Sequence, residues 1–262
     1  AARQRAVAAL LSPSDAALLS DPNNTLGIEY GRALLRVGAA PALFTIPRTG
    51  AAHDATPENA GGYSASAIRH LLAEGRRADA LSRMVPAMRA VYEAEETAGR
   101  APVFAAACER AILARLRSMT PAEFDALDTG HEGVGQRLYN ASRNAATLDA
   151  VLDNAKTKRY AYARLRRMVL WAYLGLSPAE LPASVPYLRV LAANETGRAL
   201  LGRMRKTARL PVITKPAAIR SLSPDAQRLF ETESRAADLY ALAYPELTEA
   251  CGSLWRQNPV MP

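Results

Sequence analysis

Hydrophobic positions spaced three and four residues apart recur along most of the chain and predict a mainly helical protein. The first such run ends near Leu19, where a Ser-Asp-Pro-Asn-Asn turn signal follows. Helical spacing resumes at Thr25, and Gly38 ends it. Residues 42–46 differ, because they are almost continuously apolar and are closed by Pro47, as expected of a buried strand. This order of helix and strand is typical of one α/β unit of a parallel sheet.

From Ser64, whose side chain can cap a helix running to Glu74, the pattern predicts helices with short interruptions up to residue 155. Thr120, followed by proline at the first helical position, marks one of these helix starts. The preceding segment, residues 48–63, is rich in Gly, Ala, Thr and Pro and predicts a loop. The other expected elements are a helix over 156–174, strands over 187–191 and 211–214 flanking a helix over 196–206, and a last helix over 224–242.

Charge is distributed unevenly along the chain. Residues 156–220 contain 14 Lys and Arg against two acids, a net +12, whereas the other 197 residues carry −4 of the total of +8. One strongly basic third on an otherwise near-neutral chain indicates a local partner of high negative charge, most commonly nucleic acid.

The overall composition is that of an ordinary globular protein, 49% hydrophobic and 22% charged. No apolar run approaches the ~20 residues that span a bilayer, and no secretion signal opens the chain. Cys108 and Cys251 lack metal-ligand spacing and are too few for a disulfide framework. His53, His70 and His131 are scattered, so no zinc site is predicted. A cytoplasmic protein with reduced thiols is expected.

Asn23 and Asn24 open one of the predicted helices and are a first candidate site. Free N–H groups and the positive end of the helix dipole favour phosphate at such a position, and side-chain amides beside it can hold a nucleotide. A simple asparagine cap explains the same residues. Arg48, next to the predicted loop, is a further candidate phosphate contact, with a solvated loop charge as its alternative.

Ser64, Ser66 and Arg69 form a second candidate site at another predicted helix start. Two hydroxyls and free N–H groups, with a guanidinium one turn later, make a plausible phosphate clamp. A serine-capped helix with an exposed arginine is the structural alternative.

The helix predicted over 156–174 is the strongest candidate interface. On an ideal wheel of 3.6 residues per turn, five of its cations lie within an arc of about 160°, and apolar residues point the other way. A solvated face usually mixes acids with bases, but no acid lies between the first and last of these cations. Such a face suits an RNA backbone. The five cations are Lys156, Arg159, Arg164, Arg166 and Arg167.

Six ordered segments carry a family resemblance that covers nearly the whole chain. They are PNNTLGIEY at 22–30, TIPR with AHD at 45–54, SASAIR at 64–69, HEG at 131–133, KTKRY at 156–160 and PVITK at 211–215. Together they resemble the tRNA(Met) cytidine acetate ligases, which are similar to the HxGH nucleotidyltransferases.

The resemblance implies a ligase that modifies tRNA. ATP and acetate would give acetyl-adenylate and pyrophosphate, and the N4 amine of the wobble cytidine of elongator tRNA(Met) would then attack the acyl carbon. Adenylation turns a carboxylate oxygen into a good leaving group, while the protein positions the reactants and neutralises phosphate charge. ATP with Mg²⁺ is the implied cofactor, and acetate is the implied second substrate.

The resemblance also implies an α/β + α fold class. Residues 1–75 would form the C-terminal part of a Rossmann-like ATP-binding domain, and residues 76–262 a mainly helical tRNA-binding domain. The implied ATP contacts are Asn23, Asn24, Arg48, Ser64, Ser66 and Arg69. The implied tRNA contacts are Lys156, Lys158, Arg159, Arg164 and Lys215, to which the helical wheel adds Arg166 and Arg167. No residue is assigned as catalytic and none as a metal ligand.

One departure from the family matters most. The HxGH motif does not occur in this sequence and is expected before residue 1, so this chain alone is not expected to make acetyl-adenylate. Two alternatives stay open. An HxGH-type transferase acting on a small molecule would leave the +12 segment unexplained. A non-catalytic RNA-binding module fits the missing motif, whereas Asn24, Arg48 and Arg69 argue against it.

Overall fold

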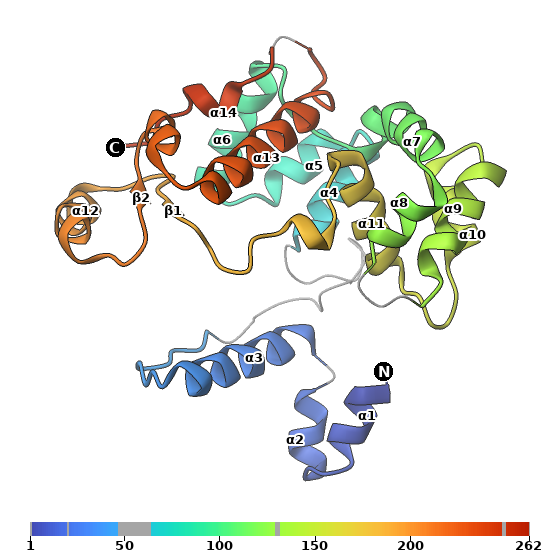
Figure 1. Ribbon diagram of the computed structural model, residues 1–262, viewed down its shortest axis with the longest axis horizontal. Helices are drawn as coiled ribbons and strands as arrows, with labels where there is room; N and C mark the ends of the chain where they lie inside the picture. Colours follow the sequence, from blue (N-terminus) through green and yellow to red (C-terminus); the bar gives the residue numbers. More distant parts are fainter. Residues whose placement is uncertain (1, 20, 47–63, 129–131, 248–249, 262) are drawn as a thin grey trace. The chain divides into compact units, whose positions relative to one another are not determined.

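A computed structural model describes residues 2–19, 21–46, 64–128, 132–247 and 250–261 of the chain. The described residues are mainly helical and contain one two-stranded sheet (Figure 1). The chain divides at residue 50 into two compact units. The predicted domain boundary at residue 75 stays a prediction, although residues on both sides of it share one hydrophobic cluster.

The first unit contains α1 (Ala2–Ala8), α2 (Pro13–Leu18) and α3 (Pro22–Val37). The single opening helix predicted to end near Leu19 is wrong, because Ser12 caps a new helix with proline at its first position. The predicted end of α3 is confirmed. Gly38 takes a left-handed conformation there, with φ of 66°, which glycine adopts without steric cost.

Residues 42–46 form no strand, so that prediction is wrong. A strand pairs its backbone N–H and C=O groups with those of a neighbouring strand. No described residue of the first unit lies in a strand, so residues 42–46 have no such partner there. Phe44 and Ile46 are each 92% exposed. No residue whose side chain is described between residues 5 and 46 is buried, so this part of the first unit has no hydrophobic core of its own.

The second unit is built around three hydrophobic clusters. Its α-helices are α4 (Ala65–Ala73), α5 (Arg77–Ser82), α6 (Pro86–Thr97), α7 (Glu109–Ser118), α8 (Pro121–Ala126), α9 (Val134–Asn144), α10 (Leu148–Ala155), α11 (Tyr162–Leu174), α12 (Glu195–Thr207), α13 (Pro224–Ala241) and α14 (Ser253–Arg256). Three short 3₁₀ segments, η1 (Ala105–Cys108), η2 (Pro178–Glu180) and η3 (Pro216–Ser221), and the strands β1 (Leu188–Arg189) and β2 (Val212–Ile213) complete it.

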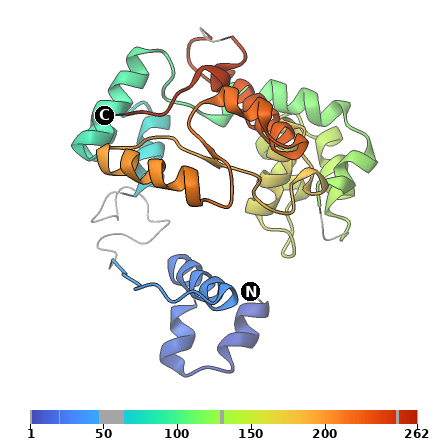
Figure 2. The same ribbon diagram turned by 60° about the vertical axis from the view of Figure 1, so that its left-hand side comes forward.

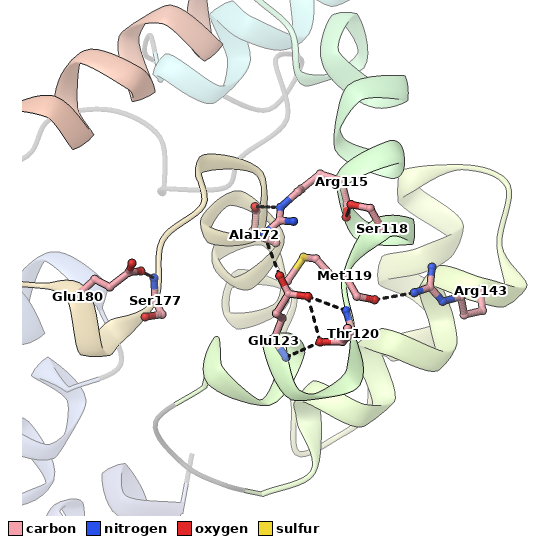
Figure 3. Close-up of polar contacts among 9 residues, drawn as sticks. All are labelled: Arg115, Ser118, Met119, Thr120, Glu123, Arg143, Ala172, Ser177 and Glu180. Carbon is pink, nitrogen blue, oxygen red and sulfur yellow. Dashed lines mark hydrogen bonds and ion pairs between the residues drawn. The ribbon is translucent and has the colours of Figure 1, made fainter.

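The largest cluster lies among α7, α8, α9, α10 and α11, and Phe124, Leu138 and Leu165 are completely buried in it. Thr120 caps α8, as predicted, in a reciprocal pair with Glu123 (Figure 3). A smaller cluster joins α4 to α5. The helices of the large cluster therefore form a bundle with its own core.

Arginines bind the backbone carbonyls at the ends of the bundle helices. The last four carbonyls of a helix lack partners within it, and the negative end of the helix dipole attracts a cation. Figure 3 shows two of these contacts, those of Arg143 and Arg115. The pairs, donor first, are Arg143 with Met119 (2.7 Å), Arg117 with Ala145 (3.1 Å), Arg137 with Ala155 (2.7 Å) and Arg115 with Ala172 (3.2 Å).

The sheet confirms the predicted order of strand, helix and strand. Leu188 pairs with Val212 and Arg189 with Ile213 in parallel register, and α12 lies between the two strands in sequence. The third cluster, which includes Phe230 of α13, lies against this pair. Figure 1 and Figure 2 show α13 running beside α14. The predicted last helix is thus confirmed within one residue of its end.

Candidate functional site

The start of α4 presents the groups that a phosphate clamp needs. Ser64 is buried, and its hydroxyl oxygen accepts a hydrogen bond from the Ala67 N–H at 3.1 Å, so the predicted serine cap is confirmed. Ser66 and Arg69 lie one turn apart on the same face and are exposed. Within the described residues Arg69 forms no ion pair. A hydroxyl, a guanidinium and the N–H groups of a helix start could therefore hold an anion here.

The start of α3 is different, because a carboxylate occupies it. Asp21 is the cap, and its Oδ1 accepts hydrogen bonds from the N–H groups of Asn23 at 2.7 Å and Asn24 at 3.4 Å. These N–H groups are not free for phosphate, so the prediction of a phosphate site built on free N–H groups is wrong here. The alternative, in which an asparagine caps the helix, is also wrong because Asp21 is the cap. The exposed amides of the two asparagines are all that remain as candidate ligand groups. Arg48 lies outside the described residues.

The helix predicted to begin at Lys156 begins six residues later, at Tyr162. Thr157 Oγ1 accepts hydrogen bonds from the backbone N–H groups of Arg159 and Tyr160, both at 3.1 Å. Such side-chain contacts offer the backbone an alternative to helix. The single helical face that joined Lys156 and Arg159 to the later cations is therefore wrong.

Arg164 lies in an ion cluster instead of on the acid-free face predicted for it. Its guanidinium donates to both carboxylate oxygens of Asp128, at 2.7 and 2.9 Å, and to Glu132 at 3.0 Å. Arg159 reaches the same Glu132 at 3.2 Å. Hydrogen bonds from Arg164 and then Arg159 hold the pKa of Glu132 below its ordinary value. Acids from a distant part of the sequence thus engage two of the predicted tRNA contacts.

The other cations of this segment keep their charge available to a ligand. Lys156 and Arg166 lie over the ring of Tyr162, at 5.1 and 5.7 Å from its centroid. Lys158 and Arg167 are exposed, and so is Lys215, just before η3. No ion pair joins any of these five cations to another described residue.

A second set of exposed cations, not predicted as a site, lies on α12. This helix contains no buried residue, and Glu195 in its first turn is its single acid. On an ideal wheel its cations fall within about 160°. Ion pairs from them to the described part of the chain are absent. The basic composition of residues 156–220 was the signal that could have found them. They are Arg198, Arg203, Arg205 and Lys206.

A clamp-like helix start, together with cations that form no ion pair in the described chain, is the arrangement expected of a site for phosphate-bearing ligands. The chain belongs to the HIGH Nucleotidyl Transferase family, whose sequence model matches residues 1–253. The resemblance to tRNA(Met) cytidine acetate ligases is also confirmed. The chain is 30% identical to the protein of that name from Acetivibrio thermocellus, over 93% of this chain and 61% of that protein. It is 32% identical to that from Alkaliphilus metalliredigens, over 87% and 55%.

Solved structures show the same fold. Thermotoga maritima TmcAL in its apo form matches with a TM-score of 0.91 at 24% identity, over 99% of this chain and 66% of that one. The same protein bound with alpha-thio ATP matches with a TM-score of 0.88, over 99% and 65%. The chain spans about three fifths of the length of the curated relatives it matches. Among the described helices, none is both long and apolar enough to span a bilayer.

Proposed function

We propose that this chain takes part in ATP-dependent modification of tRNA. The reaction is acetylation of the wobble cytidine N4 of elongator tRNA(Met), with acetate activated as acetyl-adenylate. The observation that carries the proposal is the similarity to relatives named tRNA(Met) cytidine acetate ligase over about nine tenths of this chain. Because the chain spans only part of their length, the proposal assigns it a share of the nucleotide site and the tRNA surface.

The start of α4 is the proposed nucleotide contact. Ser66 would donate a hydrogen bond from its hydroxyl to a phosphate oxygen, and Arg69 would neutralise phosphate charge and donate beside it. Ser64 would act mainly as the cap that holds this helix start in place. The bound nucleotide of the Thermotoga protein supports ATP as the ligand class. ATP would supply the adenylate group that activates acetate.

The proposed tRNA surface consists of cations that form no ion pair with another described residue. Each phosphate bound by such a cation releases counterions, so affinity falls with the logarithm of salt concentration. Arg159 keeps part of this role because its side chain is 64% exposed, whereas Arg164 is held by two carboxylates. The surface comprises Lys156, Lys158, Arg166, Arg167, Lys215, Arg198, Arg203, Arg205 and Lys206.

The test is binding of elongator tRNA(Met) and of a second tRNA by this chain across a salt series. Strong salt dependence with a preference for tRNA(Met) is the expected result. Absence of binding at low salt would refute the tRNA surface and leave the small-molecule transferase.

In parallel, Arg69→Ala should weaken ATP binding and leave tRNA binding unchanged, and the reverse pattern would overturn the clamp.

A further inference from the structure

A cavity of about 280 Å³ opens among η3, α13 and α14, and none of its lining residues belongs to the sites described above. Its volume corresponds to roughly nine water molecules, less than a typical pocket for a drug-sized ligand. Ile219 is 1% exposed and contributes a rigid apolar wall. The other lining residues are aromatic, charged or polar: Arg220, Gln227, Glu231 and Trp255.

One side of the cavity is formed by an arginine that lies over an aromatic ring. The guanidinium carbon of Arg220 lies 5.4 Å from the centroid of the Trp255 ring. Trp255 in turn packs edge-to-face on the fully buried Phe230, with centroids 4.6 Å apart and planes at 71°. A fully buried core residue thus packs against the indole ring and supports it. Planar guanidinium and aromatic groups are surfaces on which unstacked RNA bases lie.

Gln227 and Glu231 line the same cavity and offer hydrogen-bond acceptors. The Gln227 amide nitrogen donates to the carbonyls of Arg220 at 3.2 Å and Leu222 at 2.9 Å. Both of its N–H groups are thus used, which leaves the amide oxygen as its acceptor. Glu231 lies four residues later on the same face of α13, is exposed, and makes no ion pair within the described chain. Arg220, which lines the same cavity, adds a set of N–H donors.

We propose that this cavity binds a single unstacked nucleobase that carries an exocyclic amino group. The base stacks against the Arg220–Trp255 pair, its amino group donates to the Glu231 carboxylate, and Arg220 donates to an acceptor on the ring edge. Carboxylates accept from the cytosine N4 amine by the same chemistry in nucleic-acid recognition. Uracil lacks an amino group and fits this set of groups less well. The inference extends the proposed function, on which the assignment of the base to a tRNA rests.

Fluorescence of Trp255 provides a direct test. The chain contains two tryptophans, so Trp171→Phe leaves Trp255 as the single reporter. Short oligocytidylate should quench it, with affinity about tenfold higher than oligouridylate, the equivalent of one good hydrogen-bonded contact. An abasic ribose-phosphate oligomer of equal charge should not quench it. Glu231→Gln should remove the preference for cytosine, whereas Asp225→Asn, an equal charge change elsewhere on α13, should keep it.

Two outcomes overturn the inference: no quenching by any oligomer, or equal quenching by cytidylate, uridylate and the abasic strand. If Trp171→Phe fails to fold, the indole N–H resonance of Trp255 in the unsubstituted chain reports the same titration. Binding of whole tRNA is measured separately. Retained tRNA binding without quenching refutes the base pocket alone, whereas quenching without tRNA binding supports the pocket and refutes the proposed function.

Discussion

The two basic regions of the second unit have similar residues in different electrostatic settings. Around Tyr160, two arginines are bound by Glu132 and Asp128, which come from the segment between α8 and α9. On α12, four cations have no such partners within the described chain. A count of charge along the sequence treats both regions alike. Their availability to a ligand is decided by carboxylates that the fold brings to one region and not to the other.

The bundle extends this contrast, because several of its arginines bind backbone carbonyls. There Arg115, Arg117, Arg137 and Arg143 stabilise helix ends. Substituting them would perturb the fold before it changed any ligand contact. The cations worth testing as tRNA contacts are therefore those that the fold does not use.

The largest expected effect comes from breaking the ion cluster of the bundle. Arg164→Ala should lower the free energy of unfolding by about 2–3 kcal/mol, because the Asp128 carboxylate, only 9% exposed, loses the guanidinium group that contacts both of its oxygens. Urea denaturation measures this. Arg167→Ala, on the same helix but without an ion pair among the described residues, should change stability by less than about 0.5 kcal/mol. Equal effects of the two substitutions on stability would show that the ion pairs of Arg164 do not distinguish it from Arg167.

The next largest effect is expected on α12. Arg203→Ala with Arg205→Ala should lower tRNA affinity about tenfold and reduce the slope of log affinity against log salt by about 2, since each lost phosphate contact removes about 1. Thermal unfolding should change little because α12 has no buried residue. The matched control is Arg36→Ala with Arg110→Ala, which removes the same charge from exposed positions elsewhere. If the control gives the same loss, net charge and not α12 explains the binding.

A smaller effect of opposite sign is expected from releasing Arg159. Glu132→Gln removes the carboxylate that pairs with it, so tRNA affinity should rise about twofold and the salt slope should steepen. Glu93→Gln, which breaks an exposed pair on α6, is the control with the same charge change. Unchanged or weaker tRNA binding by Glu132→Gln would show that Arg159 does not contact tRNA.

The smallest effect concerns acid stability. The pKa of Glu132 is lowered in the folded chain, so its pairing stabilises the fold fully above the ordinary value of 4.5 and less as pH falls through the lowered value. The urea midpoints of the unsubstituted chain and of Glu132→Gln should therefore differ most above pH 4.5 and converge as the pH falls below the lowered pKa of Glu132. A difference that stays constant with pH would assign the stabilisation to another contact.

Local signals predicted three of the helix boundaries. Ser64, Thr120 and Gly38 each act within one turn of their own position, so the sequence around them contains the whole cause. The strand expected over residues 42–46 depends on a partner that no local pattern supplies. The pairing of Arg164 depends on Asp128, 36 residues earlier, which a helical wheel cannot include.

The exposed cations of α12 escaped prediction for a simpler reason: they were included in the charge of the basic third without being placed on their own helix. The free amide oxygen of Gln227 could not be found from sequence at all. Its availability follows from two backbone carbonyls that take both N–H groups of the same side chain.

The way α12 is attached has a consequence for its motion. Its base is held by a two-residue ladder and by the bridge of Ala192 to Val260, while no residue along the helix is buried. Segments with few buried contacts open at low free-energy cost, so amide protons of α12 should exchange with solvent faster than those of α9 or α11. An RNA that binds α12 must also restrict the motion of this helix. The conformational entropy lost on binding then offsets part of the electrostatic attraction.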